Sequence, residues 1–347
     1  MSRNSRLPLR WRRSTPDQSG DSDADEILFA APAIAGPLET YLALGDSIAF
    51  GQTDIIPVSL GDQGYVTLYA DFLAKQNAGV RPNVVNLAFP GETSTSFFTG
   101  VSPFGLPPHN VLDSFNLNYQ ADPAQSQNSL MLSKIASEAA AGHEISHVSF
   151  ALGVNDLIPF ELLHPDFFTL PPDQQKALID GFAGTLTANY VATLSEIREA
   201  LPHADLLLLN YYNSAAVLGL DNPFNIINEI FDGGQTALID SLAGPFNARV
   251  VDIHTPFEGH ETELTYVLSG GVHPNDKGYA VIADQMIVAT VPEPNTLSLV
   301  ASAIVSILGY RFLQWYRPIG PRRARRSSRS PLARPPGKAR NLLRRTG

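Results

Sequence analysis

The sequence of 347 residues contains no cysteine and is poor in charged residues. Without cysteine the chain cannot form a disulfide framework, a thiolate metal site or a cysteine nucleophile. Charged residues make up 17% of the chain and hydrophobic residues 44%. This composition excludes a disordered chain, a collagen-like repeat and a coiled coil. The length allows one large domain or two small ones.

Positive charge is scarce in the central part of the chain. Residues 27–310 contain 7 Lys and Arg against 29 Asp and Glu, whereas 12 basic residues and no acidic ones follow from Arg311 onward. Phosphate binding needs clustered Lys and Arg, so a body this acidic repels nucleic acid. We therefore expect no nucleic-acid partner.

Residues 1–36 are predicted to be a leader, either a signal segment or a disordered extension. Arg10, Arg12 and Arg13 precede an acidic block at residues 21–26 and a short apolar run over 27–36. A secretory signal needs a basic start, an apolar stretch and a small-residue cleavage site. Because the acidic block stands where positive charge belongs, a disordered leader and a start codon placed too early are the alternatives.

Residues 37–290 form the predicted folded body, in which short apolar runs alternate with segments of helical periodicity. The predicted strands are 41–44, 83–88, 145–152, 205–210 and 248–253. The predicted helices are 64–76, 130–141, 173–200, 226–242 (interrupted by Gly233-Gly234) and 276–288, and a long loop is expected over 99–129. This alternation predicts the α/β class: a three-layer α/β/α sandwich with a mostly parallel, flavodoxin-like sheet of about five strands.

Polar and glycine residues follow these strands at the points where a parallel sheet binds its ligands. Gly45-Asp46-Ser47 follows the first strand, Gly91 the second, and Gly153-Val154-Asn155-Asp156 the third, while His273 precedes the last helix. The carboxyl ends of parallel strands share one edge of the sheet, so we expect these groups to converge there.

The converging residues have the chemistry of a serine hydrolase. A serine hydroxyl is a poor nucleophile at neutral pH and needs an adjacent base, for which His273 is the candidate beside Ser47. Attack on an ester carbonyl creates an oxyanion that fixed N–H donors must meet. The predicted donors are the backbone amides of Ser47 and Gly91 and the side-chain amide of Asn155.

Other polar residues are predicted to serve the fold rather than the chemistry. Asp46 and Asp156 are predicted to be turn and capping residues. The remaining histidines show no metal-ligand spacing, so we expect neither a metal nor a cofactor. The Gly-x-Ser-x-Gly nucleophile elbow is absent around Ser47, which argues against the α/β-hydrolase fold.

The four blocks, taken in order, resemble those of the SGNH (GDSL-type) hydrolase superfamily: Gly45-Asp46-Ser47, Gly91, Gly153-Val154-Asn155-Asp156 and Val272-His273-Pro274. The resemblance spans about residues 39–290. It implies a lipase-like or esterase-like hydrolase of carboxylic esters that acts through an acyl-serine intermediate without a cofactor. Lipid esters, acetylated polysaccharide and small aryl esters all fit this chemistry.

One position departs from the family pattern, which places an aspartate three residues before the histidine. Gly270 occupies that position. Asp252, Glu261 or Glu263 could orient the ring from another loop, with Asp252 the candidate acid, or the Gly270 carbonyl could do so in a Ser–His dyad. The third alternative is an inactive SGNH domain that serves as a surface or matrix binding module.

The end of the chain resembles the PEP-CTERM sorting signal of Gram-negative bacteria. Pro292-Glu293-Pro294 precedes an uncharged run over 295–310 and an Arg-rich cluster that ends near Arg326. The resemblance implies a transmembrane helix, processing by an exosortase and a protein of the cell envelope or secreted from it. Residues 327–347 are predicted to be a disordered basic tail, and a buried C-terminal helix is the alternative for the apolar run.

Overall fold

A single parallel sheet forms the middle layer of the computed structural model, which describes residues 39–53, 64–101, 125–219 and 222–291. Within these residues the strand order is β2-β1-β3-β4-β5, with every neighbouring pair parallel. The strands are β1 (Glu39–Gly45), β2 (Asn83–Asn86), β3 (Glu144–Ala151), β4 (Asp205–Leu209) and β5 (Ala248–Val251). The predicted α/β class and five-stranded parallel sheet are thus confirmed.

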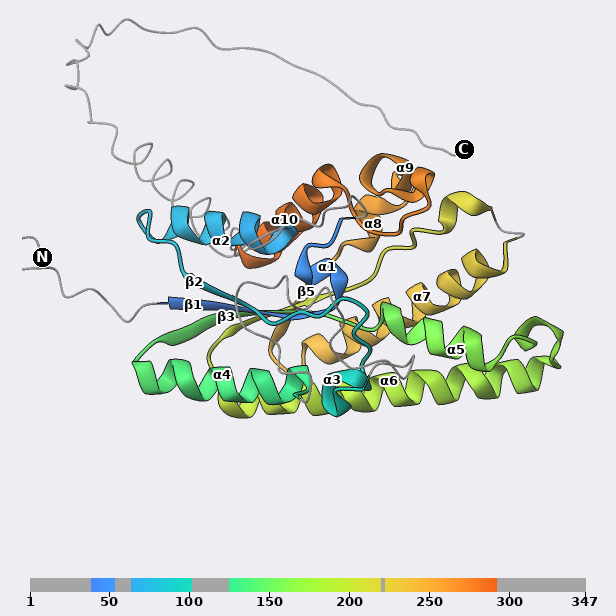
Figure 1. Cartoon of the computed structure of the whole chain (residues 1–347), viewed down its shortest axis with the longest axis horizontal. Coiled ribbons are helices and arrows are strands. Elements are labelled where there is room, and N and C mark those ends of the chain that lie inside the picture. The colour runs from blue at the N-terminus through green and yellow to red at the C-terminus, as the bar shows by residue number, and fades with distance from the viewer. Residues whose placement is uncertain (1–38, 54–63, 102–124, 220–221, 292–347) are drawn as a thin grey trace, which may run out of the picture. The chain divides into compact units, whose positions relative to one another are not determined.

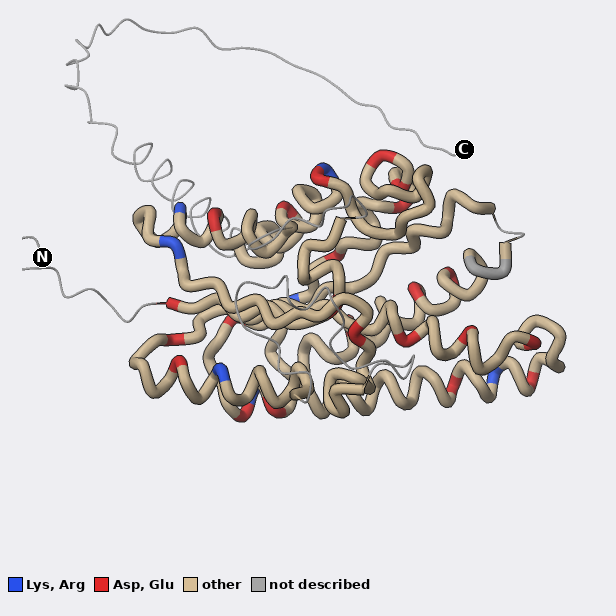
Figure 2. Tube along the Cα trace, viewed as in Figure 1, with Lys and Arg blue, Asp and Glu red and all other residues tan. Residues whose placement is uncertain are grey.

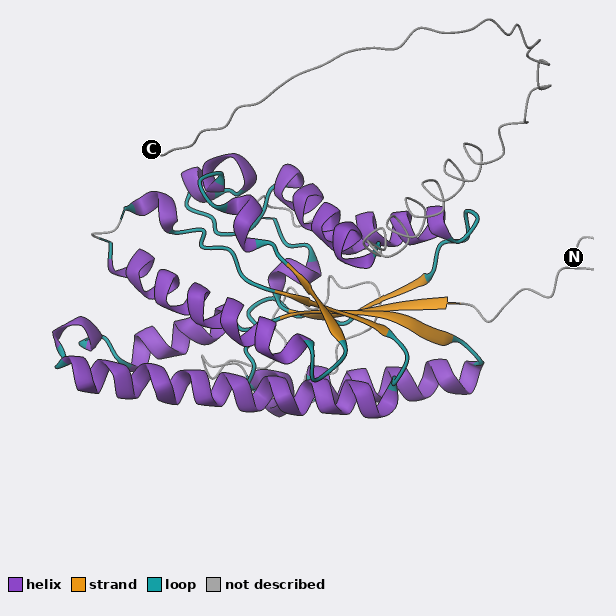
Figure 3. Cartoon of the chain, turned by 180° about the vertical axis from the view of Figure 1, so that it is seen from behind, coloured by secondary structure: helices purple, strands orange, loops and turns teal. Residues whose placement is uncertain are grey.

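Long helices cover both faces of the sheet (Figure 1). One face packs against α2 (Gly64–Gln76) and α10 (Asp276–Thr290). The other packs against α4 (Gln127–Ala141), α6 (Pro172–Ala200) and α7 (Pro223–Ala243). Figure 3 shows the same arrangement from behind, with the strands between the two helical layers.

Shorter helical segments lie in the connections, several of them next to the strand ends. They are α1 (Ser47–Phe50), α3 (Ser96–Thr99), η2 (Val154–Asp156), α5 (Leu157–Leu163), η3 (Phe167–Thr169), η4 (Ala216–Leu218), α8 (His254–Phe257), α9 (Glu261–Leu264) and η5 (Val267–Ser269).

The core consists of two apolar layers because successive side chains of a strand point to opposite faces of the sheet. In β1, Leu42 and Leu44 belong to the layer beneath α4, α6 and α7, whereas Tyr41 and Ala43 belong to the layer beneath α2 and α10. All four residues are completely buried. A strand buried on both faces reads as a continuous apolar run, which is why the strands are visible in the sequence.

The largest differences from the predicted helices lie in α4 and α7, whereas the ends of the other predicted helices agree to within two residues. α4 begins at Gln127 rather than at residue 130, because the side chain of Ser126 accepts a hydrogen bond from the Ser129 amide and caps the helix. The expected interruption of α7 at Gly233-Gly234 is wrong, since the helix runs through both glycines. Neither glycine has a positive φ, and the buried Phe231 and Gln235 pack on either side of them.

The chain divides into two compact units, Met1–Thr290 and Val291–Gly347, and all elements named above belong to the first. The predicted leader, most of the predicted 99–129 loop and the predicted C-terminal signal lie outside the described residues. Among the described helices none is long and apolar enough to cross a membrane. Asp and Glu clearly outnumber Lys and Arg along the described trace (Figure 2).

Candidate active site

Ser47 is held at the carboxyl edge of the sheet by a glycine and a helix cap. β1 ends at Gly45, whose φ is +143°, and a Cβ added there would lie 2.1 Å from the Ala151 carbonyl oxygen, so only glycine fits. The Asp46 side chain accepts a 2.9 Å hydrogen bond from the Ile48 amide and thereby caps α1. Ser47 is the first residue of this short helix.

His273 lies near the end of the folded body in sequence but contacts Ser47 in space. The Tyr266 amide donates to the His273 carbonyl at 3.1 Å, and the Tyr212 hydroxyl donates to the Val272 carbonyl at 2.9 Å, so the loop is fixed on both sides. The Nε2 atom of His273 lies 3.0 Å from Oγ of Ser47, although 226 positions separate them in sequence. This distance allows the ring, when Nε2 carries no proton, to accept the serine proton directly.

Three N–H donors stand beside this pair. Within the described residues no acceptor is bound to the backbone amide of Ser47, which opens α1, or to that of Gly91. Gly91 has a φ of +78°, a conformation that favours glycine. The side-chain Nδ2 of Asn155 donates one proton to the Glu92 carbonyl at 3.0 Å, which leaves its second N–H for a ligand. All three residues line the same cavity, as an oxyanion site requires.

The segment that carries Asn155 is anchored from both ends. The Leu152 carbonyl accepts hydrogen bonds from the Tyr190 hydroxyl and from Nε2 of Gln235, the latter at 2.8 Å. Asp156 accepts from the amide of Ser94 at 2.8 Å and from its hydroxyl at 2.6 Å. These bonds tie the third block to the loop after β2, where Gly91 lies.

Buried carboxyl groups lie beneath the site. Burial raises the pKa of Asp46 to about 7, and the negative charges of Asp156 and Glu92 add to the rise, against the hydrogen bond from Ile48. Burial likewise raises the pKa of Asp156 to about 6, despite its hydrogen bonds from Ser94. The Asp46 side chain caps α1, as the sequence predicts. The predicted capping role of Asp156 is wrong, because its side chain caps no helix and instead bonds to Ser94, 62 positions away.

The candidate orienting acids have partners of their own. Oδ1 of Asp252 accepts hydrogen bonds from the Asn210 side chain at 3.0 Å and from the Thr255 amide at 3.1 Å. Burial raises the pKa of Asp252, but these hydrogen bonds outweigh that effect and hold it below its usual value. Within the described residues, the Asp252 carboxylate is not joined to His273, so its assignment as the orienting acid stays a prediction.

The two glutamates considered for the same role also bond elsewhere. Glu261 is buried and accepts from the Gly259 amide at 3.0 Å. Glu263 is exposed and pairs with Nζ of Lys277 at 3.2 Å. Gly270 follows η5 with a φ of +84° and lines the same cavity as His273. The alternative in which the Gly270 carbonyl orients the His273 ring also stays a prediction.

Ser47 and His273 open into a cavity of about 650 Å³, a size typical of small-molecule sites. Ser47 and His273 line it together with oxyanion candidates Gly91 and Asn155. Its wall also includes Glu161 from α5, and burial raises the pKa of this carboxyl group. Within the described residues no cluster of three or more histidine and acidic side chains could hold a metal ion.

Two supporting residues carry no signal in the sequence. The side chain of Gln127 is completely buried and brackets Gly45, accepting from its amide at 2.7 Å and donating to its carbonyl at 2.8 Å. The same side chain donates to the Glu92 carboxylate at 3.0 Å, which links β1 to the Gly91 loop. Tyr212 belongs to the connection after β4 and supports the His273 loop, and neither residue stands within a motif.

The fold and this site together define a serine-hydrolase arrangement on a doubly covered parallel sheet. The model of the GDSL-like lipase/acylhydrolase family matches residues 43–281. The chain therefore belongs to this family, which is a family of carboxylic ester hydrolases. None of the curated proteins matches the chain.

Solved structures of related fold are distant in sequence. The lipase Lip_vut3 from a goat rumen metagenome is 17% identical over 72% of this chain and 97% of its own, with a TM-score of 0.49. The acetylxylan esterase Axe2 from Geobacillus stearothermophilus is 17% identical over 74% of this chain and 96% of its own, with a TM-score of 0.46. A putative GDSL-like lipase from Parabacteroides merdae is also 17% identical, over 74% of this chain and 96% of its own, with a TM-score of 0.44.

Proposed function

We propose that this protein hydrolyses carboxylic esters through an acyl intermediate on Ser47. His273 takes the hydroxyl proton as Oγ attacks the ester carbonyl, and then gives that proton to the departing alcohol. Water next attacks the acyl-serine, gives a proton to His273 and releases the carboxylic acid, after which the proton returns to Ser47. The 3.0 Å approach of Nε2 to Oγ is the observation that carries the proposal.

The charge that develops on the carbonyl oxygen meets donors that are already in place. The amides of Ser47 and Gly91 point to no acceptor within the described residues, and Asn155 is held by the Glu92 carbonyl. Donors fixed before the reaction need no reorganisation in the transition state, which is why such sites accelerate acyl transfer strongly.

The direct test uses the full chain with p-nitrophenyl esters and a fluorophosphonate, which labels activated serines covalently. Turnover and labelling are expected in the wild type and are expected to be lost in Ser47→Ala. Ser137→Ala, an exposed serine of α4 whose hydroxyl bonds to the Lys134 carbonyl, serves as the matched control and should keep both.

An inactive SGNH domain that acts as a surface or matrix binding module is the second candidate. Gly270, in the place of the family aspartate, is the observation that favours it. Intact, folded protein with neither turnover nor labelling would support this alternative. Labelling that Ser47→Ala abolishes would reject it.

We further propose that the protein is exported and anchored in the cell envelope before processing. The support is the sequence pattern of residues 291–326, which lies almost wholly outside the described residues. An exosortase-type enzyme would cut near Pro292–Pro294. Fractionation of cells that carry the full-length gene should place unprocessed protein in the membrane, and its deletion variant lacking residues 295–347 should leave that fraction. Unprocessed full-length protein that stays out of the membrane would reject the proposal.

A further inference from the structure

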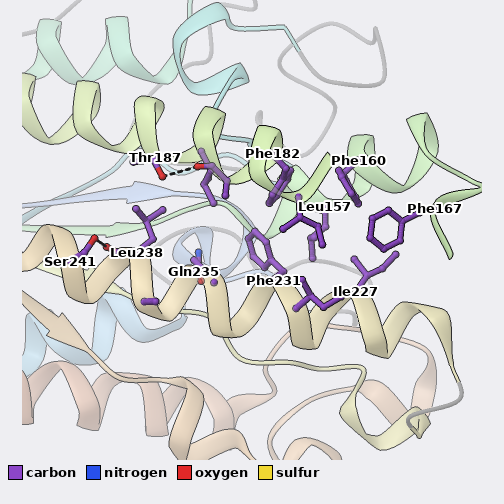
Figure 4. A pocket seen from close by; sticks show the side chains of 16 residues that line it. Leu157, Phe160, Phe167, Phe182, Thr187, Ile227, Phe231, Gln235, Leu238 and Ser241 are labelled. Atoms are coloured by element: carbon purple, nitrogen blue, oxygen red, sulfur yellow. Dashed lines mark hydrogen bonds between the residues drawn. The ribbon is translucent and has the colours of Figure 1, made fainter. Parts of the chain in front are cut away.

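A second, almost wholly apolar groove lies between α6 and α7, next to the catalytic cavity. Its volume is about 310 Å³. Figure 4 shows its side chains arranged along the two helices, with Phe160 and Phe167 near one end and Ser241 near the other. We call it the α6–α7 groove and define it by its buried base, Leu157, Leu186 and Phe231, and its exposed rim, Ala183, Gly234 and Ala237.

The lining offers nothing that would recognise a polar ligand. It contains no charged residue, and its hydroxyl groups bond to the chain itself, Thr187 to the Ala183 carbonyl and Ser241 to the Leu238 carbonyl, each at 2.7 Å. Gln235 donates to the Leu152 carbonyl, and its amide oxygen is buried beneath the surface rather than exposed to the groove. The matching ligand chemistry is therefore a hydrocarbon.

The groove adjoins the catalytic cavity at one residue, because Leu157 lines both. Leu157 follows Asn155 by two positions at the start of α5. Helices α5 and α7 each contribute side chains to both spaces. In α5, Phe160 lines the groove and Ile158 lines the catalytic cavity. In α7, Ile227 lines the groove and Asn228 lines the cavity. Leu157 therefore marks the boundary, between α5 and α7, that a chain attached at Ser47 has to pass to enter the groove.

The groove also opens to the surface among exposed apolar side chains. Ile230 lines it and is 41% exposed. Leu162 and Leu163, at the end of α5, are 65% and 74% exposed, and Phe168 beside the lining residue Phe167 is 41% exposed. Ile230 belongs to the lining, and the other three lie within three positions of the lining residues Phe160 and Phe167, so exposed apolar residues continue beyond the groove along the chain.

We propose that the α6–α7 groove binds the acyl chain of the substrate, which runs from Ser47 past Leu157, and that the protein selects esters of medium or long straight-chain fatty acids. This inference rests on the proposed ester hydrolysis. Each methylene that is buried in the transition state should raise kcat/KM about fourfold until the groove is full. An acetyl group is too short to reach beyond Leu157, so acetate esters should be poor substrates.

The test measures kcat/KM of the full chain on p-nitrophenyl acetate, butyrate, octanoate and dodecanoate. In the wild type we expect octanoate to exceed acetate by at least about 100-fold. Gly234→Leu places a side chain in the groove and should lower the octanoate-to-acetate ratio at least about tenfold. Gly233→Leu is the matched control, because Gly233 is next to Gly234 in the same helix but does not line the groove. A Cβ added at either glycine meets nothing within 4 Å. The octanoate-to-acetate ratio of Gly233→Leu should therefore stay within about twofold of wild type.

A second variant fills the groove from the opposite wall. Ala183→Leu on α6 should lower the ratio as Gly234→Leu does, so that a folding defect in one variant leaves the other to decide. A chain-length profile that is flat or falls in the wild type overturns the proposal, as does an unchanged ratio in both folded variants. If filling the groove instead dissociates a dimer, measured by sedimentation, the occupant is a second copy of the chain and the acyl proposal is wrong.

A binding measurement separates this proposal from the proposed hydrolysis. Ser47→Ala is titrated calorimetrically with dodecanoate, with the same variant carrying Gly234→Leu as the control. Binding with a negative heat-capacity change that Gly234→Leu weakens at least about tenfold supports the groove, even if no ester is turned over. Acetate turnover without dodecanoate binding would retain the hydrolase and reject the groove.

Discussion

The hydroxyl of Tyr212 donates a hydrogen bond of 2.9 Å to the carbonyl of Val272, the residue directly before His273. The Tyr212 ring also stacks on Phe257, with centroids 4.3 Å apart, so Tyr212→Phe keeps the ring and removes the hydroxyl that bonds to Val272. We expect kcat to fall about tenfold with little change in KM, because a small displacement of His273 weakens proton transfer.

The control for that variant is Tyr69→Phe. Tyr69 makes a 2.7 Å hydrogen bond to Thr290 between α2 and α10, away from the cavity. Each variant should lose about 1 kcal/mol of unfolding free energy in denaturant titrations. Equal kcat values in the two variants would show that Tyr212 does not position the histidine.

Asn155→Ala tests the third oxyanion donor. Removing one such donor typically lowers kcat by about 10²–10³, and KM should change much less because the donor acts mainly in the transition state. Steady-state kinetics on p-nitrophenyl butyrate provide the measurement. Asn83→Ala, at the exposed start of β2, should leave kcat unchanged. A decrease of less than about threefold in Asn155→Ala would remove this residue from the oxyanion site.

Asp252→Asn tests the orienting acid. Oδ1 of Asp252 accepts from Asn210 and Thr255, and an asparagine retains that acceptor. We expect kcat to stay within about threefold of wild type, whereas Asp252→Ala should lose about 1 kcal/mol of stability. A fall in kcat near 10⁴ in Asp252→Asn, the scale seen when a triad acid is replaced, would instead identify a Ser–His–Asp triad.

The pH dependence of stability tests the buried carboxyl groups. Burial raises the pKa of Asp46 to about 7 from an ordinary value of 3.8, so the folded protein binds more protons there than the unfolded chain between these values. The free energy of unfolding should therefore fall as the pH rises through this window, by up to about 1.4 kcal/mol per pH unit for this group. Above about pH 7 its contribution becomes constant.

The comparison of wild type with Asp46→Asn isolates this group from the other buried titrating residues. Denaturant titrations from pH 4 to 8 should show a shallower decline in the variant. Asp71→Asn, at a side chain 55% exposed beside Arg81, should keep the wild-type slope. Parallel curves for wild type and Asp46→Asn would mean that Asp46 stays ionised throughout.

The sequence predicts those features that depend on a short stretch of chain. The apolar run of β1 predicts a buried strand. The glycine, aspartate and serine that follow it predict that this strand ends at a ligand-binding edge of the sheet. The parallel order predicts that Ser47 and the blocks after the other strands meet at one edge, whereas the contact of His273 with Ser47 also depends on the bonds that hold its loop.

Features that depend on tertiary packing are not visible in the sequence. Gln127 brackets Gly45 across 82 positions, and nothing in its neighbourhood distinguishes it from a loop glutamine. The glycine pair of α7 suggests a break, yet packing of Phe231 and Gln235 keeps the helix continuous. The α6–α7 groove likewise arises from the spacing of two helices rather than from a motif.

The placement of Ser47 after the first strand and His273 before the last helix has a consequence for biosynthesis. A ribosome-bound chain that ends at β5 already contains Ser47, the proposed nucleophile, but lacks His273, its proposed base. On the proposed mechanism, hydrolysis cannot begin until the segment beyond β5 has been made and packed against α2. On this mechanism a nascent or truncated polypeptide does not react with esters, and only the finished domain hydrolyses them.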